Sequence, residues 1–241
     1  MSQPAKVLII DDSAVARQTL KNILSEDPEL EVVGTAPDAL IALKKISELN
    51  PDVLTLDVQM PKMDGLTFLE RLMKSRPMPV VMVSSYTQEG SETAMRSLEL
   101  GAVDIIEKPK FEVREGLNEI AILITDKVKA AAQAKMKTAR QIFMQTSPKQ
   151  STEVVLPKKT TGKRKATGQE PLIAIGASTG GTEVLREILS SLPPNLPGIV
   201  IVQHMPKAFT GSFANSLDRV SELEIKEAED GDMVESGKAL L

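Results

Sequence analysis

The chain has 241 residues, of which 41% are hydrophobic and 26% charged, so it is long enough for two ordinary domains with buried cores. Its net charge of −4 argues against nucleic acid as a partner, and the lack of cysteine excludes disulfides, thiolate metal sites and thiol nucleophiles. The first residues do not resemble a signal peptide, and no apolar run is long enough to span a membrane. We therefore expect a cytoplasmic protein with no membrane insertion.

Short apolar runs alternate with amphipathic stretches over the first half of the chain. The runs are rich in Val and Ile and are bounded by turn residues, which predicts strands at KVLII, EVVGTA, DVLTLD, PVVMVSS and DIIEKP. The stretches between them, such as ALIALKKISEL, carry apolar residues at helical spacings of three and four. Five strands alternating with five helices predict an α/β, doubly wound (βα)5 domain whose parallel sheet is covered on both faces.

The pattern changes after this domain. Residues 115–145 predict a long, alanine-rich helix, and the stretch that follows has neither a helical nor a strand period. Residues 147–170 hold six Lys or Arg against two Glu, which favours a basic linker over a partner-binding strip. Alternating strands and helices begin again at Leu172. The expected organisation is a first domain, a helical and basic linker and the N-terminal part of a second doubly wound α/β domain, over residues 1–125, 126–170 and 171–241.

Acidic side chains follow or end two of the predicted strands of the first half. Asp11 and Asp12 follow the first strand, and Asp57 ends the third. Parallel strand ends meet at one edge, where these carboxylates would repel one another unless a hard cation such as Mg²⁺ neutralised them. Ser84 ends the fourth strand and Lys108 follows the fifth, which adds a hydroxyl and an ammonium. Together they predict a phosphoryl-binding site, although an Asp at a strand end is often only a helix N-cap.

These residues resemble the receiver domain of two-component response regulators, over residues 6 to about 125. The matching motifs are DDS at residues 11–13, D-x-x-M-P-x-M-D-G at residues 57–65, the Ser84 hydroxyl and Lys108-Pro109. One departure is Ile105, three positions before the lysine, where many receivers carry an aromatic switch residue. A switch through an aromatic rotamer is therefore not assumed.

The resemblance implies that Asp57 is phosphorylated by a histidine kinase. It also implies Mg²⁺ held by Asp12, Asp57 and the Gln59 carbonyl, with Asp11 acting through water. Ser84 and Lys108 would then contact the phosphoryl group.

The stretch LIAIGASTGG, residues 172–181, places Ser178 in a glycine-lined turn after an apolar strand. The only histidine of the chain, His204, ends the next strand, GIVIVQH. If the two strands are parallel neighbours, the imidazole can take the serine proton at neutral pH. The backbone N–H groups around Gly180 and Gly181 would begin a helix and stabilise an oxyanion.

Three other interpretations compete with this serine–histidine pair. A lone histidine is commonly a structural residue. A glycine-rich turn can bind a dinucleotide, but the following strand ends in QHM and lacks the acid that would hold the ribose. The G-x-S-x-G elbow of α/β-hydrolases places its histidine last and remote, whereas here the histidine comes 26 residues after the serine. That order fails.

Over its whole length the chain resembles the chemotaxis protein-glutamate methylesterase family, through G-A-S-T-G-G and Q-H-M. The resemblance implies Ser178 as nucleophile and His204 as general base for hydrolysis of glutamate γ-methyl esters on methyl-accepting chemoreceptors. Some members also deamidate receptor glutamines. The implied partners are the chemoreceptors and a chemotaxis histidine kinase, and the esterase step needs no cofactor. The receiver would occlude Ser178 until it is phosphorylated.

The family's third catalytic residue is an aspartate, which we expect beyond Leu241. None of the acids after His204 matches its position: Asp218, Glu222, Glu224, Glu227, Glu229, Asp230, Asp232 and Glu235. We therefore expect a C-terminally truncated chain that is poorly ordered or prone to aggregation over residues 172–241. Its activity should be weak or absent, since a serine triad without its acid loses about 10⁴-fold in turnover. The alternative is a non-catalytic receiver module that acts as a phosphate sink or docking protein.

Overall fold

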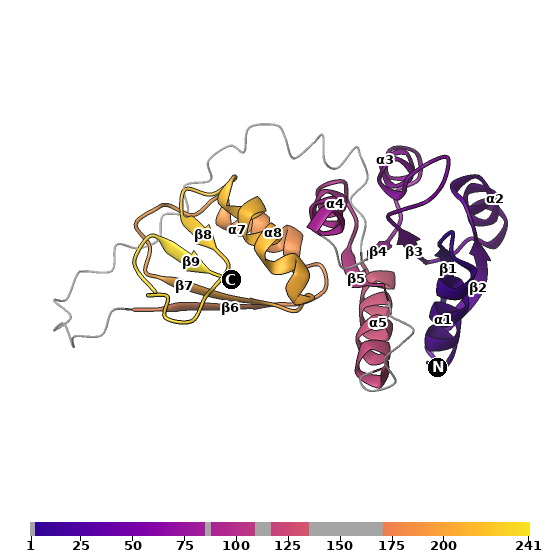
Figure 1. Cartoon of the computed structure of the whole chain (residues 1–241), viewed down its shortest axis with the longest axis horizontal. Helices are drawn as coiled ribbons and strands as arrows, with labels where there is room; N and C mark the ends of the chain where they lie inside the picture. The colour runs from indigo at the N-terminus through magenta and orange to yellow at the C-terminus, as the bar shows by residue number, and fades with distance from the viewer. Residues whose placement is uncertain (1–2, 85–87, 109–116, 135–170) are drawn as a thin grey trace.

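The computed structural model describes residues 3–84, 88–108, 117–134 and 171–241, which form two units, each built on a parallel sheet (Figure 1). The sheet of the first unit has five strands in the order β2-β1-β3-β4-β5. Its elements in chain order are β1 Ala5–Ile10, α1 Ala14–Ser25, β2 Leu30–Ala36, α2 Ala39–Leu49, β3 Val53–Asp57, α3 Gly65–Ser75, β4 Val80–Ser84, α4 Gln88–Glu99, β5 Asp104–Glu107 and α5 Leu117–Ala132. The predicted (βα)5 fold is confirmed.

Helices cover both faces of this sheet, which explains why its central strands are almost entirely apolar. Successive strand residues point to opposite faces, so β1 contributes Leu8 to one core cluster and Val7 to the other. The first cluster also holds buried residues of α2, α3 and α4, and the second holds buried residues of α1 and α5. Every residue of β3 and of β4 is buried.

The second unit has four parallel strands in the order β6-β7-β9-β8. Its elements are β6 Ile173–Ala177, α7 Gly181–Leu189, β7 Ile199–Gln203, α8 Lys207–Asp218, β8 Glu224–Lys226 and β9 Lys238–Leu240. Right-handed crossovers through α7 and α8 carry the chain in the same direction across the sheet, so both helices lie on the same face (Figure 1). The expected second α/β unit is confirmed.

The other face of this second sheet is open over β6 and β7 in the described part of the chain. Along β7 the side chains alternate, with Ile199 and Ile201 buried and Val202 68% exposed. A doubly wound sheet buries both faces, whereas here α7 and α8 cover only one.

The two units meet through α4, which packs against α8 and α7. Ala94 and Met95 of α4 belong to the same buried cluster as Leu185 of α7 and Phe213 of α8. At the margin of this contact, Arg186 Nη1 lies 3.0 Å from Glu99 Oε1. The two units therefore share apolar packing as well as an ion pair.

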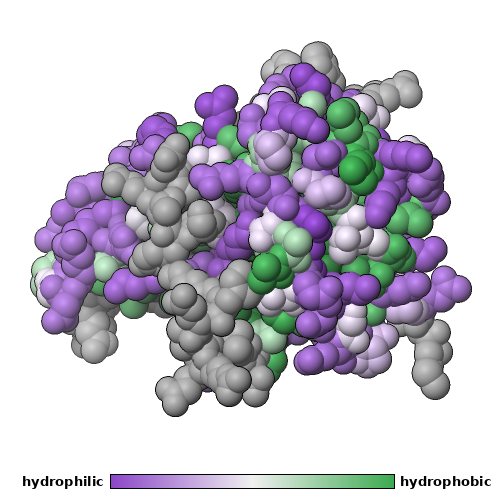
Figure 2. Space-filling model, turned by 45° about the vertical axis from the view of Figure 1, so that its right-hand side comes forward, coloured by the Kyte–Doolittle hydropathy of each residue, from purple (hydrophilic) through white to green (hydrophobic). Residues whose placement is uncertain are grey.

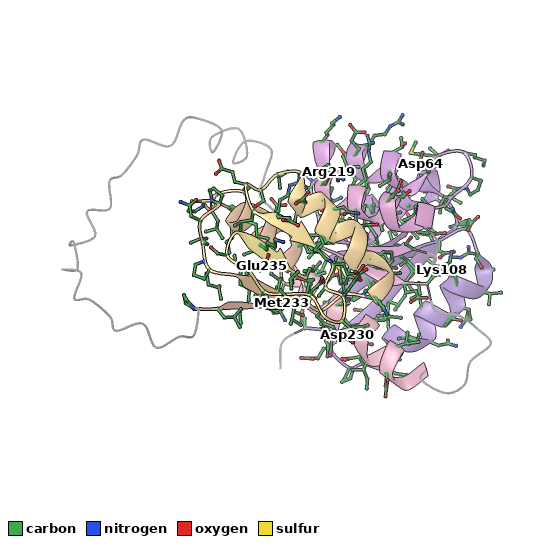
Figure 3. All side chains as sticks on the ribbon, turned by 60° about the vertical axis from the view of Figure 1, so that its left-hand side comes forward. Asp64, Lys108, Arg219, Asp230, Met233 and Glu235 are labelled. Carbon is green, nitrogen blue, oxygen red and sulfur yellow. The ribbon has the colours of Figure 1, made fainter. Side chains whose placement is uncertain are left out.

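A cleft of about 780 Å³ opens beside this contact, between α3, α4 and α8. Asp64, which caps α3, and Arg219, which follows α8, line the cleft and are labelled in Figure 3. In the view of Figure 2, hydrophilic side chains cover most of the described surface, and hydrophobic ones form scattered patches. None of the helices in the described part of the chain is long and apolar enough to cross a membrane.

The helix predicted over residues 115–145 is shorter than expected. Among the described residues α5 begins at Leu117 and ends at Ala132, where the N–H groups of Gln133 and Ala134 close a tighter turn. Helices in proteins depend mainly on packing of one face, and Ala131 is the last residue of α5 in the core cluster that contains β1 and β3 residues. Residues 135–170, with most of the expected linker, lie outside the described residues.

A buried ion pair joins α5 to the beginning of β5. Lys127 Nζ lies 2.6 Å from Asp104 Oδ1, and the Lys127 side chain is 2% exposed. Replacing Lys127 with alanine leaves the Asp104 carboxylate buried without its cation, which typically costs 3–5 kcal/mol. We predict that Lys127→Ala lowers the free energy of unfolding by about that amount in urea titrations.

The matched control is Lys74→Ala, which removes a partner of Glu70 at the same distance of 2.6 Å on the exposed face of α3. An exposed pair of this kind contributes little to stability because solvent screens it, so the free energy of unfolding should barely change. Equal effects of the two substitutions would contradict the prediction.

Candidate functional site

Three carboxylates gather at the carboxyl ends of β1 and β3, as the sequence predicts. Asp11, Asp12 and Asp57 each place one carboxylate oxygen within 4.8 Å of the others. Asp11 and Asp57 are buried, whereas Asp12 is exposed. Carboxylate oxygens are the ligands that hard divalent cations prefer, so the three side chains fit such an ion.

None of these aspartates is a helix N-cap. Ser13 caps α1 by accepting a hydrogen bond from the Ala16 N–H, and Asp64 caps α3 by accepting one from the Thr67 N–H. The capping interpretation of the acidic strand ends therefore does not account for Asp11, Asp12 or Asp57.

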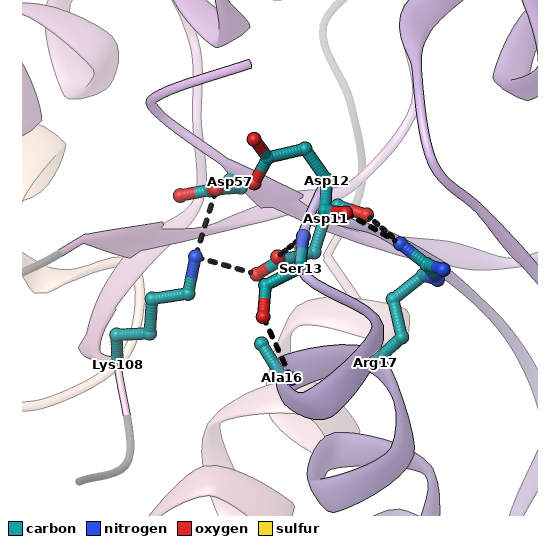
Figure 4. A network of polar contacts seen from close by, with 7 residues as sticks. All are labelled: Asp11, Asp12, Ser13, Ala16, Arg17, Asp57 and Lys108. Atoms are coloured by element: carbon teal, nitrogen blue, oxygen red, sulfur yellow. Dashed lines mark hydrogen bonds and ion pairs between the residues drawn. The ribbon is translucent and has the colours of Figure 1, made fainter. Parts of the chain in front are cut away.

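Lys108 lies between two of the carboxylates (Figure 4). Its Nζ is 2.8 Å from Asp57 Oδ2 and 2.9 Å from Asp11 Oδ2. Burial raises the pKa of Asp57, and the Asp11 charge adds to this, although Lys108 partly opposes both. Burial disfavours the Lys108 ammonium, but its two carboxylate partners outweigh that effect and raise the pKa of Lys108. The site thus holds concentrated negative charge that one cation only partly compensates.

Some of the phosphoryl-binding residues expected from sequence line a pocket of about 640 Å³, although Asp11 and Lys108 do not. Its lining includes Asp12, Asp57, Gln59 and Ser84. The Gln59 backbone N–H also partly opposes the rise in the pKa of Asp57. Lys108 reaches the same strand edge from β5, whereas Pro109 of the matching motif lies outside the described residues.

Gly65 explains part of the motif that follows Asp57. A Cβ at this position would lie 2.1 Å from the Asp57 carbonyl oxygen, so any side chain would displace the backbone of Asp57. The Gly65 N–H donates to the Val58 carbonyl oxygen at 2.9 Å. The glycine therefore permits the close turn that returns the chain to the end of β3.

Ser178 and His204 follow two strands that are direct parallel neighbours. Ala177 of β6 pairs with Gln203 of β7, and the His204 N–H donates to the Ala177 carbonyl oxygen at 2.9 Å. Both Ser178 and His204 are exposed at this edge. The described structure shows no hydrogen bond between their side chains. The two residues therefore follow neighbouring strands without a direct side-chain bond.

One part of the predicted oxyanion site is wrong. The Gly181 N–H donates to the Ser178 carbonyl oxygen at 2.7 Å, because the chain closes a tight turn before α7. Gly180, with φ of 76°, adopts the left-handed conformation that this turn requires. The Gly181 N–H is therefore not free to bind an oxyanion.

The acids that follow His204 have other partners or none in the described residues. Asp218 accepts from the Ile225 N–H, Glu227 from the Thr210 hydroxyl, and Asp232 pairs with Lys226. Asp230 and Glu235, labelled in Figure 3, belong to the loop between β8 and β9. Within the described ranges none of these carboxylates forms a hydrogen bond or ion pair with His204.

Comparison with known proteins gives one family match for each half of the chain. The response regulator receiver domain family matches residues 7–121, and the CheB methylesterase family matches residues 173–241. A protein-glutamate methylesterase/protein-glutamine glutaminase of Oleidesulfovibrio alaskensis is 47% identical over 241 residues, covering 100% of this chain and 67% of the relative. The chain belongs to the protein-glutamate methylesterase/protein-glutamine glutaminase family.

Two further comparisons define the extent of the likeness. The relative from Thiobacillus denitrificans is 51% identical, over 98% of this chain and 64% of its own length, so the present chain spans less than two thirds of that protein. The response regulator domain of Thermotoga maritima CheB has 39% identity and a TM-score of 0.50, over 56% of this chain and 100% of that domain.

Two residues near the sites were not predicted from the sequence. Arg17 donates from Nη1 to the carbonyl oxygens of Asp11 and Asp12 at 2.7 and 2.9 Å (Figure 4). Gln203 donates from Nε2 to the Ser178 carbonyl oxygen at 3.0 Å. A signal for Arg17 was present, since it lies one helical turn after the cap residue Ser13 of α1. Gln203 belongs to the Q-H-M motif, but the motif does not indicate its bond to Ser178.

The Arg17 contacts lead to a prediction about metal binding. They hold the backbone of the loop that carries Asp11 and Asp12, so Arg17→Met should weaken Mg²⁺ binding by about tenfold, as is typical when a group supporting metal ligands is lost. Isothermal titration calorimetry with Mg²⁺ measures the change.

The control is Arg71→Met, which removes the same charge from the exposed face of α3. Unchanged affinity in Arg17→Met would contradict the positioning role. No binding by the unaltered protein would reject the metal site itself.

Proposed function

We propose that this chain carries the receiver domain, over residues 1–125, and the first part of the catalytic domain, over residues 171–241, of a phosphorylation-controlled methylesterase. The protein would hydrolyse glutamate γ-methyl esters, and deamidate glutamines, on methyl-accepting chemoreceptors during chemotaxis adaptation. The observation that carries the proposal is the parallel pairing of β6 with β7, which places Ser178 and His204 at neighbouring strand ends. Partners of this kind would place the protein in the cytoplasm.

In the receiver, Asp57 would attack the phosphoryl group of a phosphohistidine on the kinase, so that a P–O bond forms as the P–N bond breaks. Asp12, Asp57 and the Gln59 carbonyl would hold Mg²⁺, with Asp11 acting through water. The ion supplies positive charge to the phosphoryl oxygens when it is bound. Lys108 would move its ammonium from Asp57 Oδ2 to a phosphoryl oxygen, and the Ser84 hydroxyl would donate to another.

In the catalytic part, Ser178 Oγ would attack the ester carbonyl while His204 takes its proton. His204 would then protonate the departing methoxide, so that methanol leaves and an acyl-serine remains. Attack by water, again with His204 as base, would release the glutamate carboxylate. In the described part of the chain, no carboxylate contacts His204.

The packing of α4 supports control of the esterase by the receiver. In Figure 1, β6 runs toward the first unit, so the loops with Ser178 and His204 lie on the side of the second unit that faces the receiver. Met95 and Leu98 of α4 line a small cavity together with Thr182, four residues after Ser178. Phosphorylation of Asp57 would loosen this docking and open the way to Ser178.

We predict that Ser178→Ala and His204→Ala each abolish nearly all hydrolysis of receptor methyl esters, to a similar extent, because the members of a triad act as a unit. Methanol release from methylated receptor, by a version extended to the length of the relatives, measures the loss. Ser190→Ala, at an exposed position after α7, is the control and should keep full activity. A largely active His204→Ala would refute its role as base.

We also predict that Asp57→Asn abolishes phosphorylation by acetyl phosphate and Mg²⁺, since Asp57 lies in the cation-binding cluster and its oxygen contacts Lys108. Basal ester hydrolysis should remain, while its activation by acetyl phosphate disappears. Asp230→Asn, at an exposed acid of the β8–β9 loop, should behave as the unaltered protein. Full labelling of Asp57→Asn would show that another residue is the acceptor.

A further inference from the structure

The side chain of Gln203 lies inside the second unit, between the two turns that carry Ser178 and His204. Gln203 is the last residue of β7 and is only 8% exposed. Its Nε2 donates to the carbonyl oxygen of Ser178 at 3.0 Å. Gln203 therefore precedes His204 in the chain, while its side chain contacts the backbone of Ser178.

The turn after Ser178 fits closely around this amide. A Cβ on Gly181 would lie 2.8 Å from Gln203 Oε1 and 2.7 Å from the Ala177 Cβ, both closer than real contacts allow. The Gly181 N–H donates to the same Ser178 carbonyl that Gln203 contacts. Two donors on different elements therefore hold one carbonyl, and the absence of a side chain on Gly181 makes the arrangement possible.

Stability alone does not account for the buried amide. Gln203 Oε1 is buried and has no hydrogen-bond partner among the described residues, which is unfavourable for a polar atom. The Ser178 carbonyl already accepts from Gly181, so the Gln203 bond is not needed to satisfy it. An apolar side chain of the same size would fill the space without the unpaired oxygen.

We infer that Gln203 is a positioning residue for the serine–histidine pair. Its amide ties the turn of Ser178 to the end of the strand that carries His204, and so sets the distance between hydroxyl and imidazole. No side-chain hydrogen bond joins Ser178 to His204 in the described structure, and both side chains are exposed, so their separation depends on the backbone turns. This inference rests on the proposed function.

The test replaces the amide by groups of similar shape that cannot donate. Gln203→Met keeps the length of the side chain, and Gln203→Glu keeps its outline but is an acceptor only when ionised. Both should lower kcat for receptor ester about 10- to 100-fold with little change in KM, since small misplacement of reacting groups has effects of this size. Labelling of Ser178 by a fluorophosphonate probe, followed by mass spectrometry, should slow by a similar factor. The thermal midpoint of Gln203→Met should stay within a few degrees of that of the unaltered protein.

A pair of glycine substitutions tests the same contact from the other side. Gly181→Ala should push against Gln203 Oε1 and reproduce the slow labelling. Gly176→Ala is the control: it lies in β6, five residues before Gly181, its added Cβ meets nothing within 4 Å, and it should label at the normal rate.

The outcomes separate the inference from the proposed function. Normal labelling and normal kcat in both Gln203 variants would overturn the inference. The inference would also be overturned if the activity of both Gln203 variants and of Gly181→Ala fell only in proportion to the fraction of protein that remains folded. Labelling of Ser178 without ester hydrolysis by the unaltered protein would reject the proposed substrate, while slower labelling of the variants would still support the positioning role. An unaltered protein that is never labelled would overturn both.

Discussion

Parallel pairing of strands determines where the reactive side chains of this protein lie. In each sheet all strands end at the same edge, so residues that are distant in sequence become neighbours once they follow different strands. Asp11 and Asp57 lie at one sheet edge because β1 pairs with β3, and Ser178 and His204 follow neighbouring strands because β6 pairs with β7. The two halves of the chain share this geometry for different proposed chemistry, phosphoryl binding in one and acyl transfer in the other.

The two edges differ in how tightly the groups are held. In the first unit, ion pairs from Lys108 and hydrogen bonds from Arg17 and Ser13 hold the carboxylates and their loop. In the second unit, the Ser178 and His204 side chains are exposed, and the contacts near them run through the backbone and through Gln203. A charge-dense site needs strong local compensation, whereas the nucleophile and its base are positioned mainly by the two turns that carry them.

Much of this arrangement was predictable from the sequence because it depends on local patterns. Apolar runs predict the strands, the alternation predicts their parallel pairing, and pairing brings Asp57, Lys108 and Ser178 to their edges.

Three features were not predictable in this way. The Gly181 N–H is taken up by the Ser178 carbonyl, a matter of turn geometry that the glycine-rich motif does not specify. The long helix ends at Ala132 because packing on the sheet, and not helix propensity, decides its length. The contact of α4 with α8 depends on which helix faces meet between units, which periodicity within each helix does not encode.

That contact has a consequence for the energetics of opening. Ala94 and Met95 of the first unit and Phe213 of the second are almost completely buried within one cluster that crosses the boundary. Separating the units would expose these side chains to water, which costs free energy because apolar surface is no longer buried. Loss of the Glu99–Arg186 ion pair would add to this cost. The free energy needed to separate the two units therefore depends on a few buried side chains such as Met95 and Phe213. Substitutions at these positions would change that free energy.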